Sequence, residues 1–298
     1  MRASLVVALM LSGIALADEV DAGAVQEVTP PPPVLVTSPC SPYVNDPFFP
    51  DSTKRDDLAL PEGPASIGYQ QADVAVGRRA CPRTEVGLGG RFAAIIDVPN
   101  FYGNLGVSGI LFGSYALNEK TELFATLEAV NYAYAVNASL EQTGLTLGNM
   151  TVGGTRVMHG GNTFVGSLSA RVLLPTSFEI PGARLVGAEV SHLMTWVPFH
   201  WLALHSAVGV DFSAAFSQAQ SFPRIGATAL IGAELKPISW FAFVLDVTGH
   251  LGVRSYLAPT AALRFRVASL GIELGGSLPL VGTDRHDFIM GGRVSWRF

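Results

Sequence analysis

From Thr84 onward, apolar and polar side chains alternate from one residue to the next in a series of short segments. In residues 257–267, Leu263 and Phe265 share one parity. Arg264 and Arg266 share the other. Because a β-strand places successive side chains on opposite faces, each segment predicts a strand with one apolar and one polar face. An amphipathic helix would need apolar residues at every third or fourth position, which these segments lack.

Twelve such segments follow one another, each about ten to fourteen residues long, which is the length of a tilted membrane-spanning strand. They cover approximately 84–97, 105–117, 121–134, 145–157, 162–174, 184–196, 201–214, 224–236, 239–250, 257–267, 270–280 and 287–298. An even number of strands returns the chain to the side of the membrane from which it started. The pattern therefore predicts an all-β fold, an antiparallel up-and-down barrel of about 12 strands that spans a membrane.

A soluble antiparallel sheet alternates in the same way, so the distribution of charged and aromatic residues has to decide between the two folds. Charged residues fall inside the segments, opposite the apolar parity, as a polar lumen requires. Aromatic residues gather at segment ends, as expected for rings at the two lipid–water interfaces. We expect Trp196, Trp201, Trp240 and Trp296 at the rim with the short turns, and Tyr102, Tyr132, Tyr134 and Tyr256 near the opposite rim. This sorting favours the membrane barrel.

The carboxyl-terminal segment, 287–298, ends in the aromatic residues Trp296 and Phe298, which share the apolar parity. This segment resembles the closing strand of bacterial outer-membrane β-barrel proteins, the porin-like superfamily, without pointing to a subfamily. The resemblance covers residues 84–298. It implies a location in the bacterial outer membrane, contact with outer-membrane lipid, and recognition of Trp296 and Phe298 by the barrel-assembly machinery. The first strand must pair with the last, because an open sheet edge is not tolerated in hydrocarbon.

The composition is apolar, with 49% hydrophobic and 14% charged residues, and the formal net charge of −5 gives no basic surplus for nucleic-acid binding. Residues 1–17 read as a secretory signal peptide, since Arg2 precedes an apolar run that ends in the cleavage-like triplet 15–17. Beyond it, no apolar stretch is long enough for a transmembrane helix.

Residues 18–83 contain eleven of the 19 prolines and show little periodicity, so they form a Pro-rich extension of the barrel domain, expected in the periplasm. Cys40 and Cys81 would meet an oxidising environment after export and are candidates for a disulfide. From residue 39 to residue 83 the extension has two readings. It is an ordered element beneath or inside the barrel, or a solvated linker closed by the disulfide, and it offers a surface for a periplasmic partner.

The polar parity places charged residues in the predicted lumen, where rings of charge set ion selectivity. The candidates for this role are Arg91, Arg264, Arg266, Arg293, Arg297, Glu85, Asp246 and Glu273. The pattern favours a narrow passive channel for small polar solutes or ions. The alternative is a plugged or structural barrel, in which the same charges pair across strands and fill the interior.

Enzyme signals are weak. His192 and Ser206 fall on the apolar parity of neighbouring strands, an arrangement similar to that of outer-membrane phospholipases. A nucleophile and its base still need a third group to orient the base, and the sequence offers none nearby on that parity. We therefore predict no catalytic residues, no metal site and no cofactor, and we keep a lipid-modifying enzyme only as a third alternative.

Overall fold

The computed structural model describes residues 62–65, 79–97, 102–137, 140–146, 148–161, 163–174, 184–216, 221–252, 255–282 and 287–298. In this part of the chain every regular element is a β-strand, and none of it forms a helix long and apolar enough to cross a bilayer. The strands are β1 (Glu85–Asp97), β2 (Tyr102–Asn118), β3 (Thr121–Asn137), β4 (Leu140–Thr146), β5 (Met150–Gly160), β6 (Phe164–Leu174), β7 (Arg184–Phe199), β8 (Leu202–Phe216), β9 (Ser221–Ile238), β10 (Phe241–Leu251), β11 (Tyr256–Val267), β12 (Leu270–Ser277), β13 (Val281–Gly282) and β14 (Phe288–Arg297).

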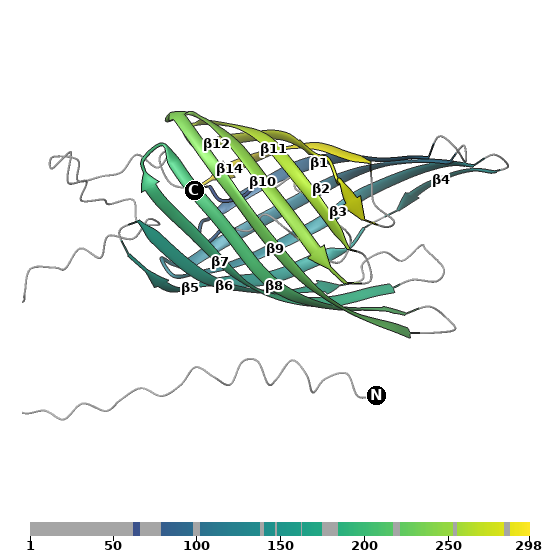
Figure 1. Ribbon diagram of the computed structural model, residues 1–298, viewed down its shortest axis with the longest axis horizontal. Helices are drawn as coiled ribbons and strands as arrows, with labels where there is room; N and C mark the ends of the chain where they lie inside the picture. The colour runs from purple at the N-terminus through teal and green to yellow at the C-terminus, as the bar shows by residue number, and fades with distance from the viewer. Residues whose placement is uncertain are drawn as a thin grey trace, which may run out of the picture. The chain divides into compact units, whose positions relative to one another are not determined.

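The strands form one antiparallel sheet that closes on itself into a barrel (Figure 1). Most strands pair with a neighbour in the chain, and β1 pairs with both β2 and β14. The pairing of β1 with β14 brings Glu85 opposite Arg297 and Val86 opposite Trp296. Closure gives β1 and β14 a partner on both sides, which satisfies their backbone in a medium without water.

The barrel has the twelve strands that the alternation predicts. Two of these strands are interrupted: β4 and β5 both pair with β3, and β12 and β13 both pair with β11. The predicted segment 145–157 was therefore too short, since pairing with β3 already begins at Leu140. The prediction missed this extension because residues 140–146 are mostly polar and carry no apolar alternation.

The two faces of the strands differ as the pattern predicts. Outward side chains such as Leu88 and Ile231 are 60% and 68% exposed, whereas the inward Thr248 and Glu234 are 1% and 0% exposed. Each outward Leu, Ile or Val gains roughly 1.5–3 kcal/mol when hydrocarbon replaces water around it. The lipid face therefore supplies the driving force for insertion, and the polar groups are confined to the lumen.

All four tryptophans lie at the barrel end that carries the short turns, about half exposed, as expected for an interfacial ring. Trp201 and Trp240 lie in the turns that follow β7 and β9, and Trp296 lies near the end of β14. The expectation for Tyr256 at the opposite rim was partly wrong. Its ring is buried inside the lumen and stacks on His250 with a centroid distance of 5.5 Å, because it shares the parity of Arg264.

Candidate functional site

The strand register brings seven of the eight predicted lumen residues together at the short-turn end of the barrel. Arg264 lies opposite Glu273, and Glu273 lies opposite Arg293, so three strands contribute one row of alternating charge. The Arg264 Nε donates to Glu273, and Arg293 Nη2 lies 3.7 Å from the Glu273 carboxylate. Arg293 and Arg297 also approach Glu85, at 3.9 and 3.8 Å.

Arg91 lies apart from this row. Its guanidinium pairs with Glu128 at 3.3 Å on the wall of β1 and β3. The remaining predicted residues, Asp246 and Arg266, are buried in the same region as Arg264, but their partners belong to another part of the chain.

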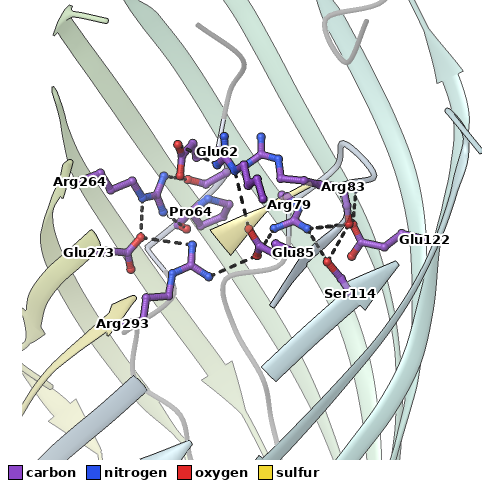
Figure 2. A network of polar contacts seen from close by, with 12 residues as sticks. Glu62, Pro64, Arg79, Arg83, Glu85, Ser114, Glu122, Arg264, Glu273 and Arg293 are labelled. Carbon is purple, nitrogen blue, oxygen red and sulfur yellow. Dashed lines mark hydrogen bonds and ion pairs between the residues drawn. The ribbon is translucent and has the colours of Figure 1, made fainter. Parts of the chain in front are cut away.

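These partners are residues 62–65 and 79–83, which lie inside the barrel and are called here the docked segment (Figure 2). Glu62 contacts the wall through its side chain and through its backbone. Its carboxylate accepts from Arg266 Nε at 2.8 Å and pairs with Arg297 at 2.8 Å. Its backbone N–H donates to Glu234 at 3.0 Å. Both the side chain and the backbone of Glu62 are therefore fixed by the wall.

The next three residues of the docked segment are held through their backbone. Arg264 uses its two terminal nitrogens to donate to the carbonyls of Gly63, at 2.5 Å, and Pro64. The N–H of Ala65 donates to the Asp246 carboxylate. A planar guanidinium matches two neighbouring acceptors better than an ammonium would, so Arg264 serves as a fork that fixes this turn.

Gly63 allows the two parts of the docked segment to touch. Its φ of +85° lies in the left-handed region, which other residues rarely adopt. A Cβ at this position would lie only 2.8 Å from Cβ of Arg79 and 2.9 Å from its Cα. A side chain at residue 63 would therefore both strain the backbone and push Arg79 away.

Arg79 contacts the adjacent part of the wall, formed by β1, β2 and β3 (Figure 2). Its guanidinium pairs with Glu85 at 2.6 Å and with Glu122 at 3.0 Å, and it donates to Ser114 Oγ at 2.9 Å. The Ser114 hydroxyl in turn donates to the carbonyl of Arg83 at 2.7 Å. The N–H of Arg83 donates to the same Glu122 carboxylate at 2.7 Å.

An apolar contact completes the docking. Ala80 and Cys81 pack against Val165 and Leu193 of the lumen wall, and the carbonyl of Ala80 accepts from Ser167 Oγ at 2.6 Å. Cys81 is disulfide-bonded. Cys40, its expected partner, lies outside the described residues, as do the predicted signal peptide 1–17 and most of the extension 18–83.

The charges of the docked segment and of the wall are matched. Burial alone would raise the pKa of Glu62, but Arg297, Arg266 and Arg264 overcome it and hold that pKa well below its usual range. Burial would lower the pKa of Arg79, but Glu85 and Glu122 outweigh burial and raise it. Glu62 is therefore a carboxylate and Arg79 a cation throughout the neutral range.

The docked segment lies in the half of the lumen near the short turns. Arg264 is three residues from the end of β11, and Glu85 is the first residue of β1. Asp246 is five residues from the start of β10, or about 17 Å along the strand.

The other half of the lumen carries separate charge pairs that span neighbouring strands. Arg171 on β6 donates to Glu189 on β7, and His250 on β10 lies 3.0 Å from Asp211 on β8. Gly226 on β9, between these two strands, makes room for the latter pair, because a Cβ there would lie 2.3 Å from His250 Nε2. This region is a polar wall of mixed sign.

The outward pair that prompted the enzyme alternative is not aligned. His192 lies opposite Val208, whereas Ser206 lies opposite Met194. The His192 ring instead stacks on His159, with a centroid distance of 5.5 Å. Among the residues that the structure describes, no group of three or more His, Cys, Asp or Glu side chains could hold a metal ion.

A closed antiparallel barrel with an apolar exterior and a charged interior is the fold of porin-like outer-membrane proteins of bacteria. No protein-family model matches the sequence, and no curated protein matches it. Solved structures do match the fold. An outer membrane channel from Pseudomonas putida F1 has a TM-score of 0.58 and 9% identity over 79% of this chain and 99% of that chain.

Two porins are similar at lower scores. The KdgM porin, in complex with disordered oligogalacturonate, has a TM-score of 0.47 and 9% identity, and covers 72% of this chain and 99% of that chain. The NanC porin has a TM-score of 0.46 and 9% identity, and covers 72% of this chain and 98% of that chain. At these identities the likeness concerns the fold alone.

The sequence pattern missed Glu62, Arg79 and Arg83, which lie in the aperiodic extension. Alternation identifies wall residues only, because it depends on the strand. A weak signal was available in the turn residues that surround Glu62, since Gly63 lies between Pro61 and Pro64. That signal predicts a turn, but not where the turn docks.

Proposed function

We propose that this chain is an outer-membrane barrel that forms a narrow passive channel for small polar solutes or ions. Its constriction lies between the docked segment and the charged wall. The observation that carries the proposal is the lumen itself, in which acidic and basic side chains from several strands face inward at one level. Charged rings at a constriction select ions by sign and size. The fold is also the one used by the Pseudomonas putida outer membrane channel.

The orientation follows from the same features. We place the short turns, the four tryptophans and the docked segment at the periplasmic end, with the rest of residues 18–83 in the periplasm. In this orientation the extension is available to a periplasmic partner, and the exposed Trp296 and Phe298 are available to the barrel-assembly machinery.

The proposal is tested by conductance in planar lipid bilayers. The wild-type protein should give discrete steps, and Arg293→Ala should shift the ion selectivity toward cations, because Glu85 and Glu273 would each lose a positive neighbour. Arg156→Ala is a suitable control, since Arg156 is exposed and lies opposite Leu168 on the outward face. Correctly folded protein without conductance steps would contradict the channel proposal.

A second function, a plugged or structural barrel, is favoured by one specific observation. The docked segment contacts the wall from β1, β2, β3, β6, β7, β9, β10, β11 and β14, which closes much of the lumen near the short turns. In that case the wild-type protein is silent, and only variants with a released segment conduct. The same bilayer measurement therefore separates the two functions.

We propose a transport role rather than an enzymatic one. The offset of His192 from Ser206 and the stacking of His192 on His159 support this choice. His192→Ala and Ser206→Ala should leave phospholipid hydrolysis by the purified protein at the background level of the wild type. Hydrolysis that both substitutions remove would overturn the assignment.

A further inference from the structure

The carboxylate of Glu62 occupies a site that the barrel wall has built for it. Arg266 presents Nε at 2.8 Å and Nη2 at 3.3 Å, and Arg297 presents Nη2 at 2.8 Å. All three residues are buried or nearly so. Two guanidinium groups on one carboxylate, away from bulk water, form a strong and geometrically specific anion site.

The wall also positions the Arg266 guanidinium, beside its hydrogen bonds to Glu62. Its Nη1 donates to the carbonyl of Ser269 at 3.4 Å. On the neighbouring strand Gly271 leaves the space for it, because a Cβ there would lie 2.4 Å from Arg266 Nη2. Both supports belong to β11, β12 and the turn between them. The site should therefore persist when Glu62 leaves.

Removal of Glu62 leaves a charge without its counter-ion. Among the residues that the structure describes, Arg266 forms its ion pair with Glu62. A buried guanidinium without an anion is costly, so the vacant site favours any small anion of matching shape. Further polar groups of the wall surround the site. Glu234 accepts a hydrogen bond from the backbone N–H of Glu62, and Arg264 donates to the backbone carbonyl of Gly63.

We infer that Arg266 and Arg297 form a binding site for carboxylate-bearing small solutes, and that Glu62 is its internal ligand. The inference rests on the proposed channel and names the class of solute that its constriction recognises. A carboxylate solute and the Glu62 side chain compete for one site, so only one of the two carboxylates occupies it at a time, and a small carboxylate can fill it when residue 62 has no carboxylate of its own.

The experiment uses the full-length protein with Glu62→Ala. This substitution removes the two terminal carbons and the carboxylate oxygens, which acetate replaces atom for atom. Glu62→Ala should raise the fraction of time in the conducting state about tenfold or more, the effect of losing hydrogen bonds to charged groups. Sodium acetate, replacing sodium chloride at constant ionic strength, should restore most of the wild-type behaviour, and acetamide should not.

A second readout does not depend on conductance. Trypsin cleaves after arginine, and Arg79 and Arg83 are about 10% exposed in the docked segment. Glu62→Ala should expose them to cleavage, and acetate should protect them again. In the Glu62→Ala, Arg266→Ala double variant acetate should have no effect in either assay. Glu119→Ala, in the exposed turn after β2, is the matched control and should behave as the wild type.

The outcomes separate this inference from the proposed function. Acetate-specific protection that requires Arg266 supports the carboxylate site, even if no variant conducts, in which case only the channel proposal fails. Equal effects of acetate and acetamide, or an acetate effect that survives in the double variant, overturn the carboxylate site. Heat-dependent mobility on gels identifies folded barrels, so that misfolded variants are not scored.

Discussion

Arg264→Ala removes the guanidinium that holds the turn of the docked segment. Arg264 donates to the carbonyls of Gly63 and Pro64, and each hydrogen bond from a charged donor contributes about 1.5–3 kcal/mol. Water in the lumen can replace part of this, so we take about half of the sum, roughly 1.5–3 kcal/mol. The ratio of released to docked segment should then rise about 10- to 150-fold.

A second effect of Arg264→Ala concerns selectivity. Glu273 would lose Arg264 and keep Arg293, at 3.7 Å, and Glu234 would lose Arg264, at 3.5 Å, and keep Lys236, at 3.2 Å. The constriction therefore gains net negative charge, and the reversal potential in a salt gradient should shift toward cation preference. The two effects are measured in the same bilayer, one as the time spent conducting and the other as the reversal potential.

Arg91→Ala is the matched control, because Arg91 is also a lumen arginine but pairs with Glu128, away from the docked segment. It should alter the time spent conducting by less than about threefold, the scale of a partly exposed ion pair. The reasoning is wrong if Arg264→Ala and Arg91→Ala release the docked segment equally, as judged by trypsin cleavage after Arg79. It is also wrong if folded Arg264→Ala protein leaves both the conducting time and the reversal potential at wild-type values.

Three further predictions follow from the docked segment and the closing strand. Gly63→Ala should release the segment, because it combines a strained φ with a contact of 2.8 Å to Arg79. Trypsin should then cleave after Arg79. Unchanged protection from trypsin would contradict the packing of residue 63 against Arg79. Because the pKa of Glu62 is lower in the docked state than in the released state, its stabilisation is complete above about pH 4.3 and is lost as the pH falls below that value. Conductance should therefore rise on acidification in the wild type and rise less in Glu62→Gln; equal acid responses would exclude Glu62 as the cause. Deletion of Phe298, which is 80% exposed, should reduce the amount of assembled barrel in membranes without changing the conductance of the molecules that do fold, and normal assembly would remove its role as a signal.

The barrel was predictable from the sequence because the alternation within each strand shows which side chains face the lipid and which face the lumen. Arg264 and Leu263 are neighbours in the chain, and the apolar parity of Leu263 is enough to place Arg264 in the lumen. The register added detail that alternation cannot provide. It set Arg264 opposite Glu273 and Glu273 opposite Arg293, a row that depends on turn lengths and on the shear of the barrel.

The docking of the extension was not predictable in the same way. Glu62 and Arg266 are 204 residues apart, and no local periodicity links them. The number of charges in the lumen was compatible with both an open and an occupied interior, since acids and bases can pair across strands or with a third element. Tyr256 shows the same limit on a smaller scale: its position in the strand predicted the correct end of the barrel, but the expected aromatic girdle placed it on the wrong face.

The docked segment has a consequence for the order in which the molecule assembles. It bridges the seam of the barrel, because Arg79 contacts Glu85 on β1 and Glu62 contacts Arg297 on β14. The binding site for the segment is therefore complete only when β14 has paired with β1. The docked segment precedes β1 in the chain but can dock only after β1 and β14 have paired. Once docked, it links these two strands through side-chain contacts on the lumen side. The docked segment therefore opposes opening of the seam, and the paired seam opposes release of the segment.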